Sequence, residues 1–195
     1  MIVWINGAFG VGKTHTSYEL LRRTENTFLF DPEKVGFFLR KFVYKSDQYE
    51  DFQNHPLWRK QVLDNLIFCD QQDVITIVPM TIVEDEIFDY IIGGLREKNI
   101  DVRHFSLMAS KSEIKKRLDR RGDKGGWTHK QIDRCLTSLI KPKYAIQIDT
   151  EKNSLNEVVE LIGEKTGIEL IKGRLNRIEA KWNWIKVLIK SNRRL

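Results

Sequence analysis

Short apolar runs, separated by amphipathic stretches, divide the chain into alternating strands and helices. Five runs are predicted to be strands because they are too short for helices and rich in β-branched and aromatic residues. They cover residues 1–5, 27–30, 74–78, 101–108 and 144–149. Between them, apolar positions recur with helical spacing over residues 16–23, 33–44, 51–69, 84–98, 110–122, 128–139 and 150–166. Strands that alternate with helices predict an α/β fold, with one five-stranded parallel sheet covered by helices on both faces.

The last predicted helix, residues 173–189, differs from the others because its polar face is strongly basic. Its apolar side chains fall on one face; they are Leu175, Ile178, Trp182, Ile185 and Ile189. Residues 172–195 hold eight basic side chains and one acidic one, a net charge of +7, whereas the whole chain carries +6. The rest of the chain is nearly neutral, so we expect no nucleic-acid partner. Such a helix predicts either contact with an anionic membrane surface or docking on the body of the protein.

Length and composition fit a single domain followed by this helix. The chain has 195 residues, of which 41% are hydrophobic, and we expect a domain at residues 1–171 and the basic helix at residues 172–195. The two cysteines, Cys69 and Cys135, are far apart, and the first strand leaves no room for a signal peptide. No apolar run approaches the ~20 residues that span a bilayer. These features predict a cytoplasmic protein, either free or peripheral at the inner face of the cell membrane.

The strongest motif follows the first strand. Residues 7–14, Gly-Ala-Phe-Gly-Val-Gly-Lys-Thr, match the phosphate-binding pattern G-x-x-x-x-G-K-[ST]. In such a loop, backbone N–H groups and the start of the next helix bind phosphate oxygens. Lys13 would reach the β- and γ-phosphates of ATP, and the Thr14 hydroxyl would bind Mg²⁺. We therefore predict an ATP site formed by Gly7, Ala8, Phe9, Gly10, Val11, Gly12, Lys13 and Thr14.

A second signal, Asp31-Pro32-Glu33, follows the second strand. Ligands bind at the carboxyl ends of parallel strands, so Asp31 is placed to activate an acceptor hydroxyl or to help hold Mg²⁺. The same residues also fit a helix start, with Asp31 as the cap and Pro32 in the first turn. The two interpretations are compatible, because a capping carboxylate can still face a site.

Aromatic residues between the second and third strands define a candidate acceptor site. Small kinases with a phosphate loop build their acceptor site in this segment, an analogy that rests on fold alone. If it holds, a partly apolar acceptor contacts Asp31, Glu33, Phe37, Arg40 and Trp58. An aromatic stripe is more commonly part of a hydrophobic core, and that alternative stays open.

Arginines around a glycine-broken loop predict a lid over the site, at about residues 117–134. Four of them flank the loop: Arg117, Arg120, Arg121 and Arg134. Guanidinium groups match phosphate geometry and neutralise the charge that develops in phosphoryl transfer. The alternative is a solvated basic helix. The third strand ends in Pro79-Met80-Thr81, without the acid that many P-loop proteins place there, which leaves Asp31 as the main acid of the site.

Five segments, taken in order, resemble a known family. They are INGAFGVGKT at residues 5–14, DPEKVG at 31–36, IVPMTIV at 77–83, FSLMASK at 105–111 and KQIDRC at 130–135. Together they resemble the bacterial tunicamycin-resistance ATP-binding protein, nearly from end to end. The resemblance implies a P-loop kinase fold akin to chloramphenicol phosphotransferase and shikimate kinase. It also implies ATP binding and membrane association through the basic C-terminal helix.

The resemblance also implies roles for single residues. In chloramphenicol phosphotransferase an Asp after the second strand is the catalytic base, and Asp31 has a similar place. In adenylate-kinase-like enzymes an arginine that leads into the lid stacks on adenine, and another, one turn later, contacts phosphate. Arg117 and Arg121 fit this spacing, with Arg120 as the alternative to Arg121. The predicted catalytic set is then Asp31, Lys13, Arg121 and Arg134, with Thr14 and Asp31 as the metal ligands.

The leading hypothesis is a phosphotransferase that uses ATP and Mg²⁺ to modify a hydroxyl of a nucleoside antibiotic, such as tunicamycin, or of a similar small molecule. One alternative is an ATP-gated binding protein that sequesters the drug at the membrane without modifying it. A second alternative is a housekeeping nucleoside or metabolite kinase, whose basic tail only docks on the body.

Overall fold

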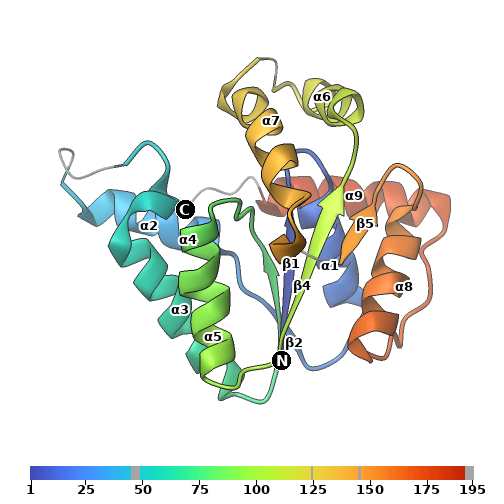
Figure 1. Cartoon of the computed structure of the whole chain (residues 1–195). Coiled ribbons are helices and arrows are strands. Elements are labelled where there is room, and N and C mark those ends of the chain that lie inside the picture. Colours follow the sequence, from blue (N-terminus) through green and yellow to red (C-terminus); the bar gives the residue numbers. More distant parts are fainter. Residues whose placement is uncertain (45–48, 124, 145, 192–195) are drawn as a thin grey trace.

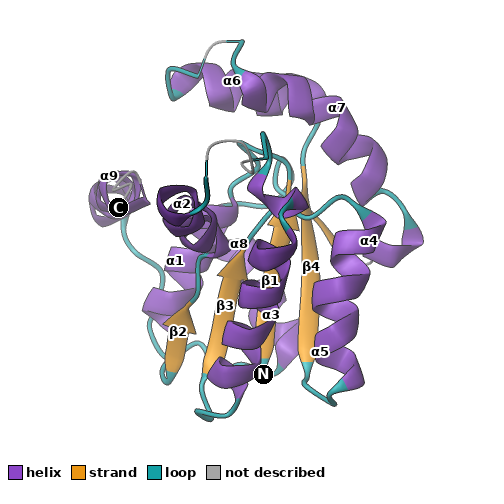
Figure 2. Ribbon diagram, turned by 90° about the vertical axis from the view of Figure 1, so that its left-hand side faces the viewer, coloured by secondary structure: helices purple, strands orange, loops and turns teal. Residues whose placement is uncertain are grey.

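The five predicted strands form one parallel sheet in the computed structural model, which describes residues 1–44, 49–123, 125–144 and 146–191. The strands are β1 (Ile2–Gly7), β2 (Thr27–Leu29), β3 (Ile75–Pro79), β4 (Val102–Met108) and β5 (Gln147–Asp149), in the spatial order β2-β3-β1-β4-β5. β1 lies at the centre and pairs with both β3 and β4. The carboxyl ends of all strands therefore meet at one edge of the sheet (Figures 1 and 2).

Helices cover both faces of the sheet, which confirms the predicted α/β fold. Figure 1 shows α3 (Pro56–Asp70), α4 (Asp85–Phe88) and α5 (Gly94–Glu97) on one face, and α1 (Lys13–Arg23) and α8 (Leu155–Thr166) on the other. A π-helical turn, Asp89–Gly93, joins α4 and α5. α2 (Pro32–Phe42) packs against α3, while α6 (Lys111–Arg120) and α7 (Trp127–Leu139) lie above the carboxyl edge of the sheet.

Large side chains of the strands and helices fill the core. Trp4 of β1, Trp58 of α3 and Phe105 of β4 are fully buried. The indole Nε1 of Trp4 donates to the Met80 carbonyl at 3.1 Å, so its polar atom is satisfied. This bond also fixes the segment that follows β3, which lies beside the phosphate loop.

Short polar side chains fix the points at which helices begin. Asp31 accepts a hydrogen bond from the backbone N–H of Glu33 at 3.0 Å and caps α2, as its sequence context predicts. Ser110 caps α6 in the same manner, and Ser154 and Glu157 form a reciprocal capping box at α8. All three helices start just after a strand, so their N-termini lie near the carboxyl edge of the sheet.

Several element boundaries differ from those predicted. β5 begins at Gln147 because Pro142–Tyr144 forms a 3₁₀ turn that buries the Tyr144 ring. The helix expected over residues 51–69 starts as a separate 3₁₀ turn, Phe52–Asn54, and α3 begins only at Pro56, a residue suited to the first turn of a helix. The last helix, α9 (Arg177–Ser191), starts after Asn176, whose side chain accepts hydrogen bonds from the next turn.

Residues 171–174 attach the C-terminal segment to the body. Arg22 and Arg23 of α1 donate to the carbonyls of residues 173 and 172, both at less than 3 Å. Arg174 pairs with Glu160 of α8 at 2.6 Å, and Arg23 also contacts this carboxylate at 3.2 Å. The hydrogen bond from Arg174, followed by that from Arg23, lowers the pKa of Glu160 to about 2. The start of the tail is thus held by paired charges.

α9 divides its apolar side chains between the body and solvent. It contacts α1, with Val187 buried, while Ile178 and Trp182 are 72% and 62% exposed. The side chains of Trp184 and Ile189 fall outside the described part. Across the residues that the structure describes, no helix has both the length and the apolar character to cross a membrane.

Candidate functional site

The loop between β1 and α1 has a shape that depends on its glycines. Gly7, Gly10 and Gly12 have φ values of 146°, 80° and 117°. A Cβ atom on Gly7 would lie 2.6 Å from Val11 Cγ1 and 2.8 Å from the Leu107 carbonyl oxygen. A side chain at this position would therefore clash and would also strain the backbone. α1 begins directly after Gly12, so the positive end of the helix lies at the loop.

Lys13 turns back over this loop. Its Nζ donates to the carbonyl oxygens of Gly7, at 2.9 Å, and Ala8, at 3.0 Å. Burial lowers the pKa of Lys13 to about 8, against the opposing influence of nearby Glu33, and the positive charge of Arg121 adds to the lowering. The ammonium group thus lies against the phosphate loop, and it loses its proton at a lower pH than an exposed lysine does.

We expect this low pKa to limit activity in alkaline solution. Protonated Lys13 carries the positive charge that binds a phosphate group. Because kcat/KM reports the pKa values of the free enzyme, kcat/KM for ATP should fall above about pH 8. Replacing Lys13 by Arg, which stays charged, should remove this alkaline limb even if the rate is lower. The measurement is kcat/KM against pH for both proteins. An unchanged alkaline limb in Lys13→Arg would assign the titration to another group.

Neutral side chains behind the loop join it to the segment that follows β3. Asn6 is fully buried, and its Oδ1 accepts hydrogen bonds from the backbone N–H groups of Gly7, at 2.8 Å, and Ile82, at 3.0 Å. The Thr81 hydroxyl donates to the Gly7 carbonyl at 2.8 Å. Thr81 thus supports the loop at the end of the third strand, where the sequence lacks the acid common in P-loop proteins.

Several predicted catalytic and metal-binding residues line one cavity of about 120 Å³ beside the loop, here called the central cavity. Its lining includes Lys13, Thr14, Asp31, Glu33 and Arg121. Asp31 follows β2 and Arg121 follows α6, so the fold brings together residues that are far apart in sequence. Burial raises the pKa of Asp31, although the hydrogen bond from Glu33 N opposes this, and burial lowers the pKa of Arg121.

The donor atoms of the central cavity suit magnesium. Thr14 offers a hydroxyl and Asp31 a carboxylate, and Mg²⁺ binds oxygen ligands while keeping several waters. Among the described residues, no three His, Cys, Asp or Glu side chains are grouped so that they could hold a metal ion by themselves. These two residues therefore fit a magnesium ion that is bound jointly with nucleotide phosphates.

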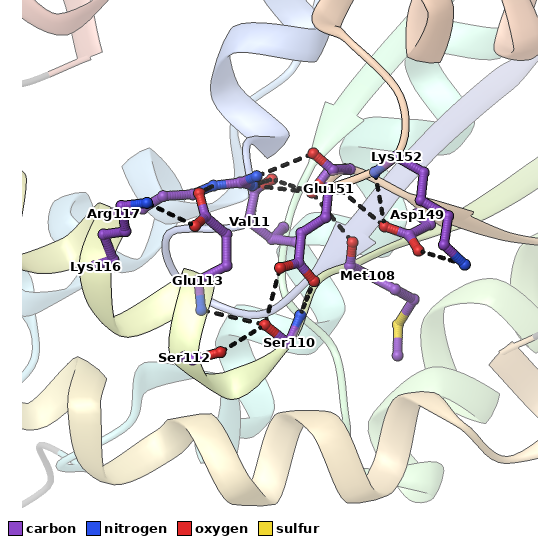
Figure 3. Close-up of polar contacts among 11 residues, drawn as sticks. Val11, Met108, Ser110, Ser112, Glu113, Lys116, Arg117, Asp149, Glu151 and Lys152 are labelled. Atoms are coloured by element: carbon purple, nitrogen blue, oxygen red, sulfur yellow. Dashed lines mark hydrogen bonds and ion pairs between the residues drawn. The ribbon is translucent and has the colours of Figure 1, made fainter.

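Arg117 fixes the base of the lid (Figure 3). Its guanidinium donates to the Val11 carbonyl at 3.1 Å and to the hydroxyl and carbonyl oxygens of Thr150, both at 2.9 Å. Glu151 accepts hydrogen bonds from the backbone N–H of Ser110, at 2.7 Å, and from its hydroxyl, at 2.9 Å. The start of α6 is thus tied to the segment after β5, and its second half to the phosphate loop.

A second cavity of about 380 Å³, the lid cavity, lies between the loop, α6 and the start of α8. Among its lining residues are His15, Arg117, Arg120, Arg121 and Asn153. Gly10, Gly12 and Arg121 also line the central cavity, so the two cavities adjoin. Its volume is in the range of small-molecule sites. The predicted nucleotide-binding arginines therefore lie together, beside the phosphate loop.

A third cavity of about 410 Å³, the aromatic cavity, lies between α2, the 3₁₀ turn Phe52–Asn54 and the start of α7. Its lining includes the predicted substrate residues Glu33, Phe37 and Arg40, together with Phe52, Gln53 and Trp127. Phe9 and Glu33 line both this cavity and the central cavity. The central cavity thus adjoins the lid cavity through Arg121 and the aromatic cavity through Glu33.

Four predicted site residues do not line any of these three cavities: Gly7 and Ala8 of the phosphate loop, Trp58 and Arg134. Trp58 is fully buried, and its Nε1 donates to the Pro32 carbonyl at 3.0 Å. This corrects the expectation that Trp58 contacts an acceptor, because the indole packs in the core. Arg134 of α7 pairs with Asp51, at 3.8 Å, and with Glu84, at 3.4 Å. A catalytic role for Arg134 would require α7 to move, and it stays a prediction.

Sequence reasoning misses several residues that line the cavities: Tyr18, Phe52, Gln53, Trp127, Thr150 and Asn153. Thr150 and Asn153 follow β5, so the binding of ligands at the carboxyl ends of parallel strands could have indicated them. Gln53 and Trp127 come from a 3₁₀ turn and from the lid. Only the fold brings these two residues together, and no local pattern marks them.

A parallel sheet with a phosphate loop after β1 and an arginine-bearing helical lid above it defines a nucleotide-binding protein with the P-loop kinase fold. Among solved structures, the chain is similar to the tunicamycin resistance protein of Deinococcus radiodurans, with 34% identity and a TM-score of 0.77. The match covers 88% of this chain and 98% of the other. The protein therefore belongs to the tunicamycin resistance protein family.

More distant structures share the fold. A sugar kinase from Janibacter sp. matches with 16% identity and a TM-score of 0.65, over 86% of this chain and 94% of the other. A gluconokinase from Sinorhizobium meliloti matches with 13% identity and a TM-score of 0.59, over 82% of this chain and 87% of the other. No protein-family model matches the chain, and no curated protein does so.

Proposed function

We propose that the protein is a phosphotransferase that uses Mg²⁺ and ATP to phosphorylate a hydroxyl of tunicamycin or of a similar small molecule. The observation that carries this proposal is the central cavity, where Asp31, Lys13 and Arg121 lie together. This cavity adjoins a nucleotide-sized cavity on one side and an aromatic cavity on the other. The similarity to the D. radiodurans tunicamycin resistance protein makes this drug the first candidate acceptor.

The residues of the central cavity would divide the reaction between them. Asp31 accepts the proton of the acceptor hydroxyl, whose oxygen attacks the γ-phosphorus of ATP. The bond from the γ-phosphorus to the bridging oxygen breaks, and ADP leaves with the electron pair. Lys13 and Arg121 neutralise charge on the transferring phosphoryl group. Magnesium, held by Thr14 and Asp31, supplies further charge neutralisation when bound.

Burial favours this use of Asp31. The raised pKa of its carboxyl makes the ionised form a stronger base than an exposed aspartate. The hydrogen bond from Glu33 N holds the carboxylate in place without taking both of its oxygens. Arg117 and Arg120 would bind the nucleotide in the lid cavity, and closure of the lid would exclude water.

ADP release, measured with and without tunicamycin, tests the proposal. A phosphotransferase should release ADP faster in the presence of drug, and one ADP should form for each drug molecule modified. Drug that binds tightly without raising ADP release would instead support ATP-gated sequestration. If tunicamycin neither binds nor stimulates, a different small hydroxyl compound becomes the candidate acceptor, as in a metabolite kinase.

The outer side of α9 favours a second part of the proposal, contact with an anionic membrane. Ile178 and Trp182 are exposed on a helix that carries several basic residues. Each basic residue near an anionic surface would contribute ~1 kcal/mol to the free energy of membrane binding. The buried Val187 and the ion pairs of residues 171–174 would keep the body attached to the helix while the exposed side chains enter the lipid.

We expect the double variant Ile178→Ser/Trp182→Ser to bind anionic vesicles at least tenfold more weakly than the wild type. Full burial of each side chain in lipid would contribute about 1.5–3 kcal/mol. Co-sedimentation with phosphatidylglycerol-containing vesicles measures the change, and vesicles of phosphatidylcholine alone test the charge dependence. Phe68→Ser is the matched control, because Phe68 is 61% exposed on α3. Equal loss of binding in this control would contradict a role specific to α9.

A further inference from the structure

Gln53 presents its side-chain amide to the aromatic cavity. Gln53 is only 5% exposed and lines this cavity. Among the described residues, its side-chain amide makes no hydrogen bond. Its amide nitrogen and oxygen stay accessible to solvent, so a ligand that entered the cavity could form hydrogen bonds with them.

The backbone around Gln53 is held in place from both sides. Its N–H donates to the Asp51 carboxylate at 3.0 Å, and its carbonyl accepts a hydrogen bond from Arg59 Nε at 2.8 Å. The side chain therefore starts from a fixed position. A carboxamide presents a donor and an acceptor side by side, so it pairs with a ligand edge that has an acceptor next to a donor.

Aromatic rings surround the rest of the cavity. Phe37 and Phe52 meet edge to face at 6.0 Å, and Phe9 and Trp127 do so at 5.2 Å. Gly36 permits the position of Phe52, since a Cβ atom there would lie 2.5 Å from that ring. Rings bind flat groups by stacking and edge contacts. The cavity is therefore suited to a planar part of the acceptor.

The charges of the lining disfavour an anion. Among the described residues that line the cavity, Glu33, Glu50 and Asp51 are acidic and Arg40 is basic. Arg40 donates to the Glu50 carbonyl at 2.9 Å and lies 5.6 Å from the Phe52 ring centroid. Arg134 offsets part of the charge of Asp51, at 3.8 Å. Lys13 of the central cavity in turn interacts with Glu33, so these charges leave no surplus positive charge that would bind an added phosphate or carboxylate.

We propose that Gln53 determines acceptor specificity by hydrogen bonding the donor–acceptor edge of a flat, uncharged heterocycle held among Phe37, Phe52 and Trp127. The inference rests on the proposed function, because it takes the aromatic cavity as the acceptor site. It deepens that function by naming the recognised group, a nucleobase-like ring, and the residue that reads it. Phosphorylated or carboxylated compounds of the same size are disfavoured, because the lining offers no surplus positive charge to bind them.

Binding of matched probes to the full-length protein tests the inference. The probes are uridine, cytidine, adenosine and guanosine, their 5′-monophosphates, and ribose, each titrated by calorimetry without ATP. We expect at least one nucleoside to bind at least tenfold more tightly than its monophosphate and than ribose. Gln53→Leu should lower the affinity for that nucleoside at least tenfold. Gln53→Glu, which keeps the shape of the side chain but loses the amide donor, should lower this affinity as well. The control Gln72→Leu replaces an exposed glutamine and should leave the affinity for the nucleoside unchanged.

The inference is overturned if no nucleoside binds, if ribose or a monophosphate binds equally well, or if both Gln53 variants keep the wild-type affinity. A phosphorylation assay on the same compounds separates this result from the proposed function. A nucleoside that binds through Gln53 but is never phosphorylated would contradict the phosphotransferase and leave the recognition intact. Phosphorylation of ribose or of a monophosphate would support the transferase and contradict the role of Gln53.

Discussion

Replacing Asp31 by Asn is expected to lower the rate of phosphoryl transfer by about 10²–10⁴-fold, the usual contribution of a general base. Asparagine cannot accept the proton of the acceptor hydroxyl, whereas its side-chain oxygen can still accept the hydrogen bond from Glu33 N. Asn is also as good a helix cap as Asp, so α2 should keep its start. The thermal stability should therefore change little, and so should the affinity for ATP measured without Mg²⁺, the ion that Asp31 would help to hold. Steady-state kinetics, nucleotide titration and thermal unfolding measure the three quantities.

Two further variants make this result specific. Asp149→Asn is the matched control, since Asp149 also ends a strand and accepts a hydrogen bond from the N–H two residues later, at 2.8 Å. It lies outside the three cavities, and we expect wild-type turnover. Glu33→Gln tests the neighbouring acid of the central cavity. If Glu33→Gln abolishes turnover while Asp31→Asn retains it, the base is Glu33 and the assignment of Asp31 is wrong.

Lys13→Met is expected to reduce kcat at least a hundredfold and to weaken ATP binding as well. In other enzymes, removing one preorganised donor that faces developing charge lowers kcat by a similar factor. Lys13 is such a donor in this site, because its Nζ lies against the carbonyl oxygens of the phosphate loop. Stability should not fall, because burial already disfavours the charged form of Lys13, as its lowered pKa shows. Kinetics and thermal unfolding of the same preparation separate the two effects.

Lys152→Met provides the control for lost charge near the site. Its side chain is 83% exposed and follows β5, so turnover and ATP affinity should stay at the wild-type level. Wild-type kcat in Lys13→Met would mean that the nucleotide phosphates lie away from the loop. A large fall in its unfolding temperature would show instead that Lys13 supports the loop structure.

The sequence could predict those parts of the molecule in which chemistry depends on local spacing. The phosphate loop needs glycines at fixed positions, and the observed φ values of Gly7 and Gly12 explain why. Asp31 carries two local signals, a strand end and a helix start, and both describe its place correctly. The order of strands and helices follows from the alternation of their hydrophobic periods, because a parallel strand needs a crossover helix.

Other parts depend on contacts between distant segments, which spacing does not encode. Trp58 could be predicted to lie on a helix, but the side of the helix on which its ring is buried is decided by packing against Pro32. Gln53 has no neighbours in sequence that suggest a binding role, and its significance comes from its place in a cavity that Trp127 also lines. The start of β5 was misplaced because the apolar Tyr144 fits a strand pattern, although it is buried from a 3₁₀ turn.

The mass of the drug after incubation with protein, Mg²⁺ and ATP tests the central claim most directly. The account predicts a product heavier than tunicamycin by one phosphoryl group, formed in a one-to-one ratio with ADP and absent when Asp31→Asn replaces the wild type. Fragmentation would place the added group on a hydroxyl oxygen. Tunicamycin recovered at unchanged mass, from protein that binds both ATP and drug, would contradict phosphoryl transfer to this acceptor and favour sequestration.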